Sequence, residues 1–77
     1  MASRKGVLGV VFKGYGNTDG VLYIVKKLSV YKAPIQIWTR RGDSYLETRL
    51  SASTIIKLFN DFEVKHQTEK RIVLKKE

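Results

Sequence analysis

The stretch "IQIWTRRGDSYLETRL", residues 35–50, decides the fold, because it predicts two strands joined by a tight turn. We take Gly42-Asp43 as the two loop residues, since a Gly-Asp pair between alternating apolar residues is typical of a hairpin. The predicted pairs on one face are Ile35–Leu50, Ile37–Thr48 and Thr39–Leu46, and those on the other are Gln36–Arg49, Trp38–Glu47 and Arg40–Tyr45. The hairpin therefore has one apolar face and one face of aromatic and charged side chains.

Upstream of this hairpin the pattern predicts two more strands. Residues 6–13 alternate, with Leu8, Val10 and Phe12 on one face. The glycine-rich segment 14–20 is typical of a hairpin loop. Residues 21–32 follow as a long strand that Ala33-Pro34 ends. Its predicted apolar face consists of Leu22, Ile24, Leu28 and Val30.

Downstream, residues 51–62 predict a short amphipathic helix. Ser51 and Ser53 are candidate N-caps. Ile55, Leu58, Phe59 and Phe62 repeat at the spacing of one helical face. The last segment predicts a brief strand near Val64, a turn over residues 67–69 and a strand over residues 72–74.

These elements predict an α+β fold, a small twisted antiparallel sheet in the order β-β-β-β-α-β-β with one amphipathic helix packed on one face. The chain has 77 residues, enough for a single domain, which we place at residues 6–77. Residues 1–5 are expected to form a basic flexible arm.

The charge balance favours a polyanionic ligand. There are 15 Lys and Arg residues against seven Asp and Glu, a net charge of +8 with a pI near 10.0. Most of the excess lies in residues 1–40, where Asp19 is the only acid. Such a field attracts nucleic acid before acidic protein or a membrane surface. The alternative is a solvated basic surface without a ligand.

Other functions are disfavoured by composition. The chain has no cysteine and one histidine, so thiolate metal sites are excluded and no cofactor or metal is expected. We find no nucleophile–base pair or carboxylate dyad, and we expect no enzyme activity. No apolar run is long enough to span a membrane, so we expect a cytoplasmic protein, associated with the nucleoid or nucleus if it binds DNA.

The strand parities predict one sheet face that carries flat rings and fixed cations. Its members are Tyr23, Lys27, Tyr31, Trp38, Arg40, Tyr45 and Arg49. Proteins that bind single strands stack bases on aromatic rings and hold phosphates with cations. Lys32 is expected to add phosphate contacts, with Arg4 and Lys5 as a supporting arm. The alternatives for this face are a homodimer interface and plain cross-strand packing.

Residues 35–59 resemble the positive-cofactor-four family of single-stranded-DNA-binding transcriptional coactivators. The residues that carry the resemblance are Ile35, Ile37, Trp38, Leu50, Ser51, Ile55 and Leu58. It implies a curved antiparallel sheet backed by one helix, dimerisation through the helix side, and single strands lying across the sheet. The trailing segments "TIIKLFNDF" and "RIVLKKE" are instead similar to half of the double-wing DNA-binding domain of phage middle-promoter activators.

The sequence therefore predicts a nucleic-acid-binding protein, with single-stranded DNA as the expected ligand, acting in transcription or genome maintenance. A second hypothesis is a small protein-interaction module whose basic surface binds RNA polymerase or the ribosome. A third is a ribosomal-type protein bound to RNA.

Overall fold

The computed structural model describes residues 6–32 and 36–76, and it has the predicted α+β class. The elements in chain order are β1 (Leu8–Lys13), α1 (Thr18–Leu28), a 3₁₀ turn η1 (Ser29–Tyr31), β2 (Ile37–Arg40), β3 (Asp43–Thr48), α2 (Ala52–Leu58), β4 (Phe62–Gln67) and β5 (Arg71–Lys76). The order differs from the predicted one, because a helix stands where a second strand was expected.

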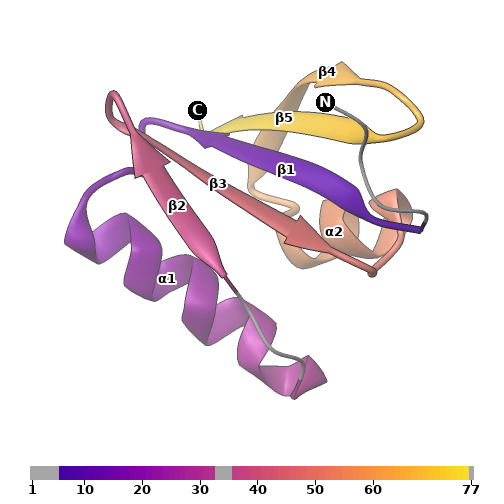
Figure 1. The fold of residues 1–77 in the computed structure, drawn as a ribbon, viewed down its shortest axis with the longest axis horizontal. Coiled ribbons are helices and arrows are strands. Elements are labelled where there is room, and N and C mark those ends of the chain that lie inside the picture. Colours follow the sequence, from indigo (N-terminus) through magenta and orange to yellow (C-terminus); the bar gives the residue numbers. More distant parts are fainter. Residues whose placement is uncertain (1–5, 33–35, 77) are drawn as a thin grey trace.

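The five strands form one sheet in the order β2-β3-β1-β5-β4 (Figure 1). β3 pairs antiparallel with β2 and with β1, and β4 pairs antiparallel with β5. The prediction of a wholly antiparallel sheet is wrong at its centre, where β1 and β5 run parallel. Parallel neighbours need a long connection, and here the whole of the intervening chain supplies it.

The segment predicted as the strand 21–32 is helical over most of its length. Asn17 caps α1, since its Oδ1 accepts a hydrogen bond of 2.6 Å from the backbone N–H of Gly20. Ile24 and Leu28 lie one turn apart and are both buried. Leu22 and Val30, which the strand prediction placed with them, are 60% and 68% exposed. The strand prediction was wrong because the spacing of Ile24 and Leu28 fits the two-residue period of a strand as well as the 3.6-residue period of a helix.

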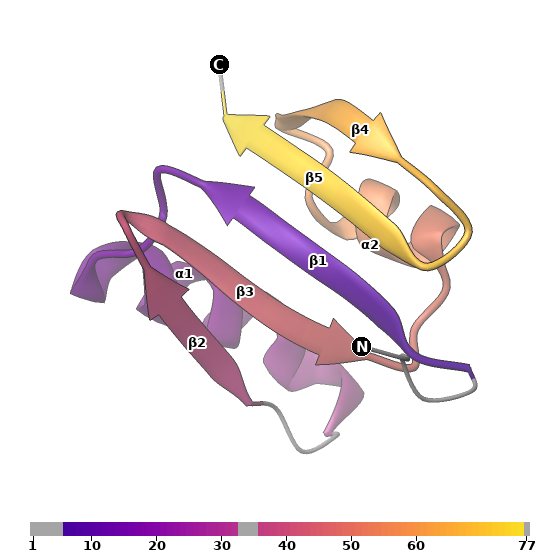
Figure 2. The same cartoon turned by 45° about the horizontal axis from the view of Figure 1, so that its top comes forward.

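Both helices lie on the same face of the sheet. Figure 2 shows the five strands in front, with α1 behind the β2–β3 side and α2 behind the β5–β4 side. The core between the layers consists of Leu8, Val10, Phe12, Ile24, Leu28, Leu46, Ile55, Phe59, Phe62, Ile72 and Leu74. The prediction that Leu8, Val10 and Phe12 share a buried face is confirmed. The ring centroids of Phe12 and Phe59 are 4.8 Å apart in an edge-to-face contact.

The C-terminal half follows the prediction closely. The side chain of Ser51 caps α2 by accepting a hydrogen bond of 3.3 Å from the N–H of Thr54. α2 ends at Leu58, and Phe62, predicted as part of the helix stripe, begins β4 instead. Ile55, Phe59 and Phe62 are all buried, and Leu58 is partly buried against the same core. The predicted final hairpin is confirmed as β4 and β5, with a register shift between Val64 and His66.

The central hairpin forms, but its register differs from the predicted one. The loop residues are Arg41 and Gly42, both with positive φ (53° and 82°), and Arg40 pairs with Asp43. Two central residues with positive φ are what a two-residue hairpin turn favours. The partner of Ile37 is therefore Leu46 and not Thr48. This shift of two residues leaves the paired side chains of β2 and β3 on their predicted faces, because side chains alternate with a period of two. Ile35, which was predicted to pair with Leu50, lies outside the described residues.

Candidate nucleic-acid interface

The sheet face that points away from the helices carries a row of side chains across all five strands. The register pairs Trp38 with Tyr45, Tyr45 with Val11, Val11 with Val73, and Val73 with His66. We call this side of the sheet the open face, since both helices lie behind it (Figure 2). Its central row changes from aromatic at β2 and β3 to aliphatic at β1 and β5.

Trp38 and Tyr45 form an aromatic pair on the open face. Their ring centroids are 5.6 Å apart with an angle of 38° between the ring planes. Trp38 is 47% exposed, while Tyr45 is half-buried. A large exposed ring costs solvation free energy that a stacking partner would recover. The pair is therefore a platform with one ring held by its neighbours and one ring accessible to a ligand.

The ring of Tyr45 leans across β1 at Gly9. A Cβ atom on Gly9 would lie 3.0 Å from the Tyr45 hydroxyl oxygen, so a larger residue would displace the ring by a few tenths of an ångström. The hydroxyl donates a long hydrogen bond of 3.4 Å to Oε2 of Glu47. Burial first, and then the charge of Glu47, raise the pKa of Tyr45, while the charge of Arg71 opposes them. Tyr45 is consequently a neutral hydrogen-bond donor at physiological pH.

The aromatic pair lines a hollow of about 650 Å³ together with three arginines. The hollow is lined by Val11, Trp38, Arg40, Arg41, Asp43, Ser44, Tyr45, Glu47 and Arg71. Its three arginines come from the β2–β3 hairpin and from β5, on opposite sides of the rings. Guanidinium groups in this position suit phosphate oxygens, which they can contact through two parallel N–H donors.

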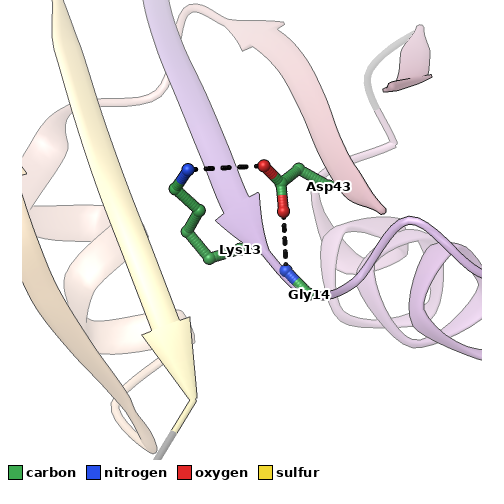
Figure 3. A network of polar contacts seen from close by, with 3 residues as sticks. All are labelled: Lys13, Gly14 and Asp43. Atoms are coloured by element: carbon green, nitrogen blue, oxygen red, sulfur yellow. Dashed lines mark hydrogen bonds and ion pairs between the residues drawn. The ribbon is translucent and has the colours of Figure 1, made fainter. Parts of the chain in front are cut away.

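Asp43 fixes the hairpin turn to the end of β1. Figure 3 shows its carboxylate accepting a hydrogen bond of 2.9 Å from the N–H of Gly14 and contacting Nζ of Lys13 at 3.4 Å. The turn is held a second time by the N–H of Gly16, which donates to the carbonyl oxygen of Gly42 at 2.9 Å. The Asp43 carboxylate is therefore engaged by Lys13 and Gly14. These contacts fix the start of β3 and with it the turn that carries Arg41.

The predicted site residues divide between the two faces of the protein. Trp38, Arg40 and Tyr45 lie together on the open face as predicted, and line the hollow. Arg49 follows the end of β3 and is exposed, but it does not line the hollow. Arg4 and Lys5 lie outside the described residues.

The prediction that Tyr23, Lys27 and Tyr31 share a sheet face with Trp38 is wrong, because they belong to α1 and η1. Lys32, the C-cap of η1, lies with them away from the hollow. These residues are part of the helical layer behind the sheet, so they cannot act on the same ligand surface as the aromatic pair. Their placement follows directly from the replacement of the predicted strand by a helix.

Tyr23 has a structural environment of its own. Its ring packs near Phe59 and Phe62, with centroids 6.4 Å and 6.2 Å away, and its hydroxyl donates to Oδ2 of Asp61 at 3.1 Å. Lys76 forms an ion pair with the same carboxylate at 3.4 Å. Burial first, and then the hydrogen bond to Asp61, raise the pKa of Tyr23. Tyr23 therefore joins α1 to the loop after α2 and to β5.

The sequence prediction missed six residues that line the hollow: Val11, Arg41, Asp43, Ser44, Glu47 and Arg71. The alternation of "RIVLKK" places Arg71 opposite the buried Ile72 and Leu74, so its face could be inferred. Its position beside the aromatic pair could not, because that requires the parallel pairing of β5 with β1. Nothing local in the sequence indicates this pairing.

Within residues 6–32 and 36–76, no group of three or more His, Asp or Glu side chains is placed to hold a metal ion. None of the helices in this part of the chain is both long and apolar enough to cross a membrane. No protein-family model, curated protein or solved structure matches the chain.

Proposed function

We propose that this protein binds single-stranded nucleic acid across the open face of its sheet, without catalysing a reaction. Bases stack on Trp38 and Tyr45, and phosphates contact the arginines at the rim of the hollow. The observation that supports this most directly is the exposed aromatic pair with guanidinium groups on both sides. Stacking on an aromatic ring stabilises binding by about 1–3 kcal/mol per base, and cations supply the sequence-independent remainder.

The position of the platform favours single strands over a duplex. In a duplex the base faces are stacked on one another, so a protein must read base edges in a groove with a projecting helix or ribbon. Here both helices lie behind the sheet (Figure 2), and the aromatic pair stands on the sheet surface itself. Unpaired bases can reach such a surface with their faces exposed.

The charges of the open face are consistent with this ligand. The hollow has three arginines against two acids, and one of the acids, Asp43, is already paired with Lys13. Outside the hollow, Lys75, the cross-strand partner of Lys13 on β5, adds a further cation beside the central row. A strand that crosses the sheet over Trp38 and Tyr45 would therefore meet positive charge on both sides. With DNA as the ligand, a role in transcription or genome maintenance follows.

The test is a fluorescence titration with short oligonucleotides. Trp38 is the only tryptophan in the chain, so its emission reports on the site alone. We expect the emission to be quenched on binding, and the affinity to fall steeply as salt rises. Single-stranded DNA, duplex DNA and RNA of one sequence are compared in the same buffer. Absence of binding at low salt, or binding with unchanged Trp38 emission, would exclude the stacking model.

A second candidate function is protein binding by the helical layer. The outer side of α1 and the η1 turn expose Leu22, Val25, Val30 and Tyr31, with exposed fractions between 39% and 68%. Exposed apolar side chains among lysines suit an acidic protein surface, such as one on RNA polymerase, or a second copy of the chain.

This second candidate is tested with purified, nuclease-treated polymerase and by sedimentation of the protein alone. Binding or self-association that is lost in a Leu22→Glu, Val30→Glu variant and retained in Trp38→Ala would support it. Binding that is lost in Trp38→Ala and retained in the Leu22→Glu, Val30→Glu variant would place the interaction on the open face.

A further inference from the structure

Glu47 is a carboxylate inside a hollow that otherwise suits phosphates. It lines the hollow with Trp38 and Arg71 and is half-buried. Among residues 6–32 and 36–76 it takes part in no ion pair, in contrast to Asp43, Asp61 and Glu63. Its one side-chain hydrogen bond is the 3.4 Å contact with the Tyr45 hydroxyl. Most of its capacity to accept hydrogen bonds is therefore free to serve a ligand.

A carboxylate repels phosphate and deoxyribose has no 2′-hydroxyl to donate, so the part of a DNA strand that it can hold is a base edge with N–H donors. The Watson–Crick edge of guanine presents two neighbouring donors, N1–H and one N–H of the 2-amino group. Two parallel N–H groups match the two oxygens of a carboxylate, as the guanidinium of arginine does. On that edge adenine, cytosine, thymine and uracil each place an acceptor next to the donor, and this acceptor would face the second carboxylate oxygen.

The surroundings of Glu47 fit the rest of a guanine. Across the sheet Gly9 pairs with Glu47 on one side and with Arg71 on the other, so both side chains flank the same position of β1. O6 of guanine lies next to N1–H and needs a donor. The Arg71 guanidinium has five N–H donors, so it can donate to O6 and still contact a neighbouring phosphate. The faces of the Trp38 and Tyr45 rings lie in the same hollow and can stack with the base.

We propose that the hollow is a guanine-selective subsite, in which the Glu47 carboxylate accepts hydrogen bonds from N1–H and the 2-amino group of an unpaired, stacked guanine. This inference rests on the proposed binding of single strands and adds base selectivity to it. Selectivity arises because every other base leaves one carboxylate oxygen opposite an acceptor, and an unpaired buried acceptor is costly.

The experiment measures binding of oligothymidylates that differ in one central base. We expect the oligonucleotide with guanine to bind roughly tenfold more tightly than those with adenine, cytosine or thymine, the discrimination of one good bidentate pair. Inosine, which lacks the 2-amino group, is expected to fall between guanine and the other bases. Trp38 emission and the anisotropy of a labelled oligonucleotide give two independent readouts of each affinity.

Variants separate base reading from general electrostatics. Glu47→Gln keeps the shape of the side chain and is expected to abolish the preference for guanine. The control is Glu63→Gln. Glu63 lies on the edge strand β4, where it pairs with Lys75 in the register, so the substitution removes the same charge away from the hollow. This variant is expected to retain the preference for guanine. Circular dichroism confirms that each variant is folded before affinities are compared.

The outcomes distinguish this inference from the proposed function. Binding of all oligonucleotides with equal affinity, or a guanine preference that persists in Glu47→Gln, would overturn the guanine subsite and leave single-strand binding in place. Binding of none of them at low salt would overturn the proposed function, and the subsite with it. A preference lost in Glu47→Gln and kept in Glu63→Gln supports both.

Discussion

The phenol ring of Tyr45 occupies the space above Gly9, where a Cβ atom would lie 3.0 Å from its hydroxyl oxygen and 3.4 Å from Cε1. Because β1 has no side chain at this position, the ring can lie across the strand toward Arg71 and Glu47. Gly9 thus leaves room for the ring of Tyr45, which lines the hollow. Gly9 has an ordinary extended backbone, so its role is to leave space and not to adopt a special conformation.

Replacing Gly9 with alanine is expected to weaken ligand binding while leaving stability nearly unchanged. The added methyl group pushes the Tyr45 ring, and affinity falls by less than the loss of about tenfold expected for Tyr45→Leu. The free energy of unfolding changes by less than about 1 kcal/mol, since alanine is the better strand residue and offsets the close contact. Fluorescence titration and urea unfolding measure the two effects. If Gly9→Ala lowers the affinity of the Tyr45→Leu variant as much as it lowers that of the native protein, the substitution does not act through the Tyr45 ring.

Replacing Arg71 with glutamine is expected to lower the affinity for single strands and to reduce the salt dependence. One phosphate contact is lost, so the slope of log affinity against log salt changes by about one. Lys26→Gln on α1 is the control, since it removes the same charge from the helical layer. Titrations at several salt concentrations give both slopes. Equal effects of the two substitutions would show that net charge, and not the open face, determines binding.

Residues Leu22 and Ile24 distinguish the observed helix from the predicted strand. Ile24 is fully buried under the sheet, and Ile24→Ala is expected to lower the free energy of unfolding by about 2–5 kcal/mol. Leu22 is 60% exposed, and Leu22→Ala is expected to change it by less than about 0.5 kcal/mol. Chemical denaturation measures both values. Comparable losses would indicate that the two side chains share one buried face, as in a strand.

The Tyr23–Asp61–Lys76 cluster predicts a small loss of stability in acid. Burial alone would raise the pKa of Asp61, but hydrogen bonds from its own backbone N–H, from Tyr23 and from Lys76 outweigh this and lower the pKa. The stabilisation by Asp61 is then fully present above its unfolded pKa near 3.8, and it is lost as the pH falls through the lower folded pKa. Because the carboxylate is exposed and screened by solvent, we expect less than about 1 kcal/mol.

Unfolding measured between neutral pH and acid tests this cluster with two substitutions. Tyr23→Phe removes one donor to Asp61, and its destabilisation relative to the native protein is expected to shrink as Asp61 protonates. Tyr31→Phe, which removes a hydroxyl from an exposed ring in η1, serves as the control and should show no such trend. A constant difference between Tyr23→Phe and the native protein across the pH range would mean that the hydrogen bond does not contribute.

Much of the candidate site could be predicted from local sequence. The alternation in residues 35–50 placed Trp38, Arg40 and Tyr45 on one face, and this held despite the different turn, because a shift of two residues preserves the faces. The predicted stripe likewise placed Ile55 and Leu58 of α2, and Phe59 at its C-cap, against the core, whereas its last member, Phe62, belongs to β4. The prediction for Tyr23 and Lys27 was wrong because residues 21–32 were assigned the two-residue period of a strand and most of them form a helix.

What the sequence by itself determined was therefore the α+β class, the faces of the paired residues of β2 and β3, and the basic character of the protein. Tertiary structure alone decided that the segment of α1 is helical, since its apolar spacing fits a strand as well as a helix, and only packing against the sheet chooses between them. It also decided that β5 lies beside β1 and brings Arg71 to the aromatic pair. Contacts between distant segments leave no local pattern, because they depend on which buried surfaces fit one another in the folded chain.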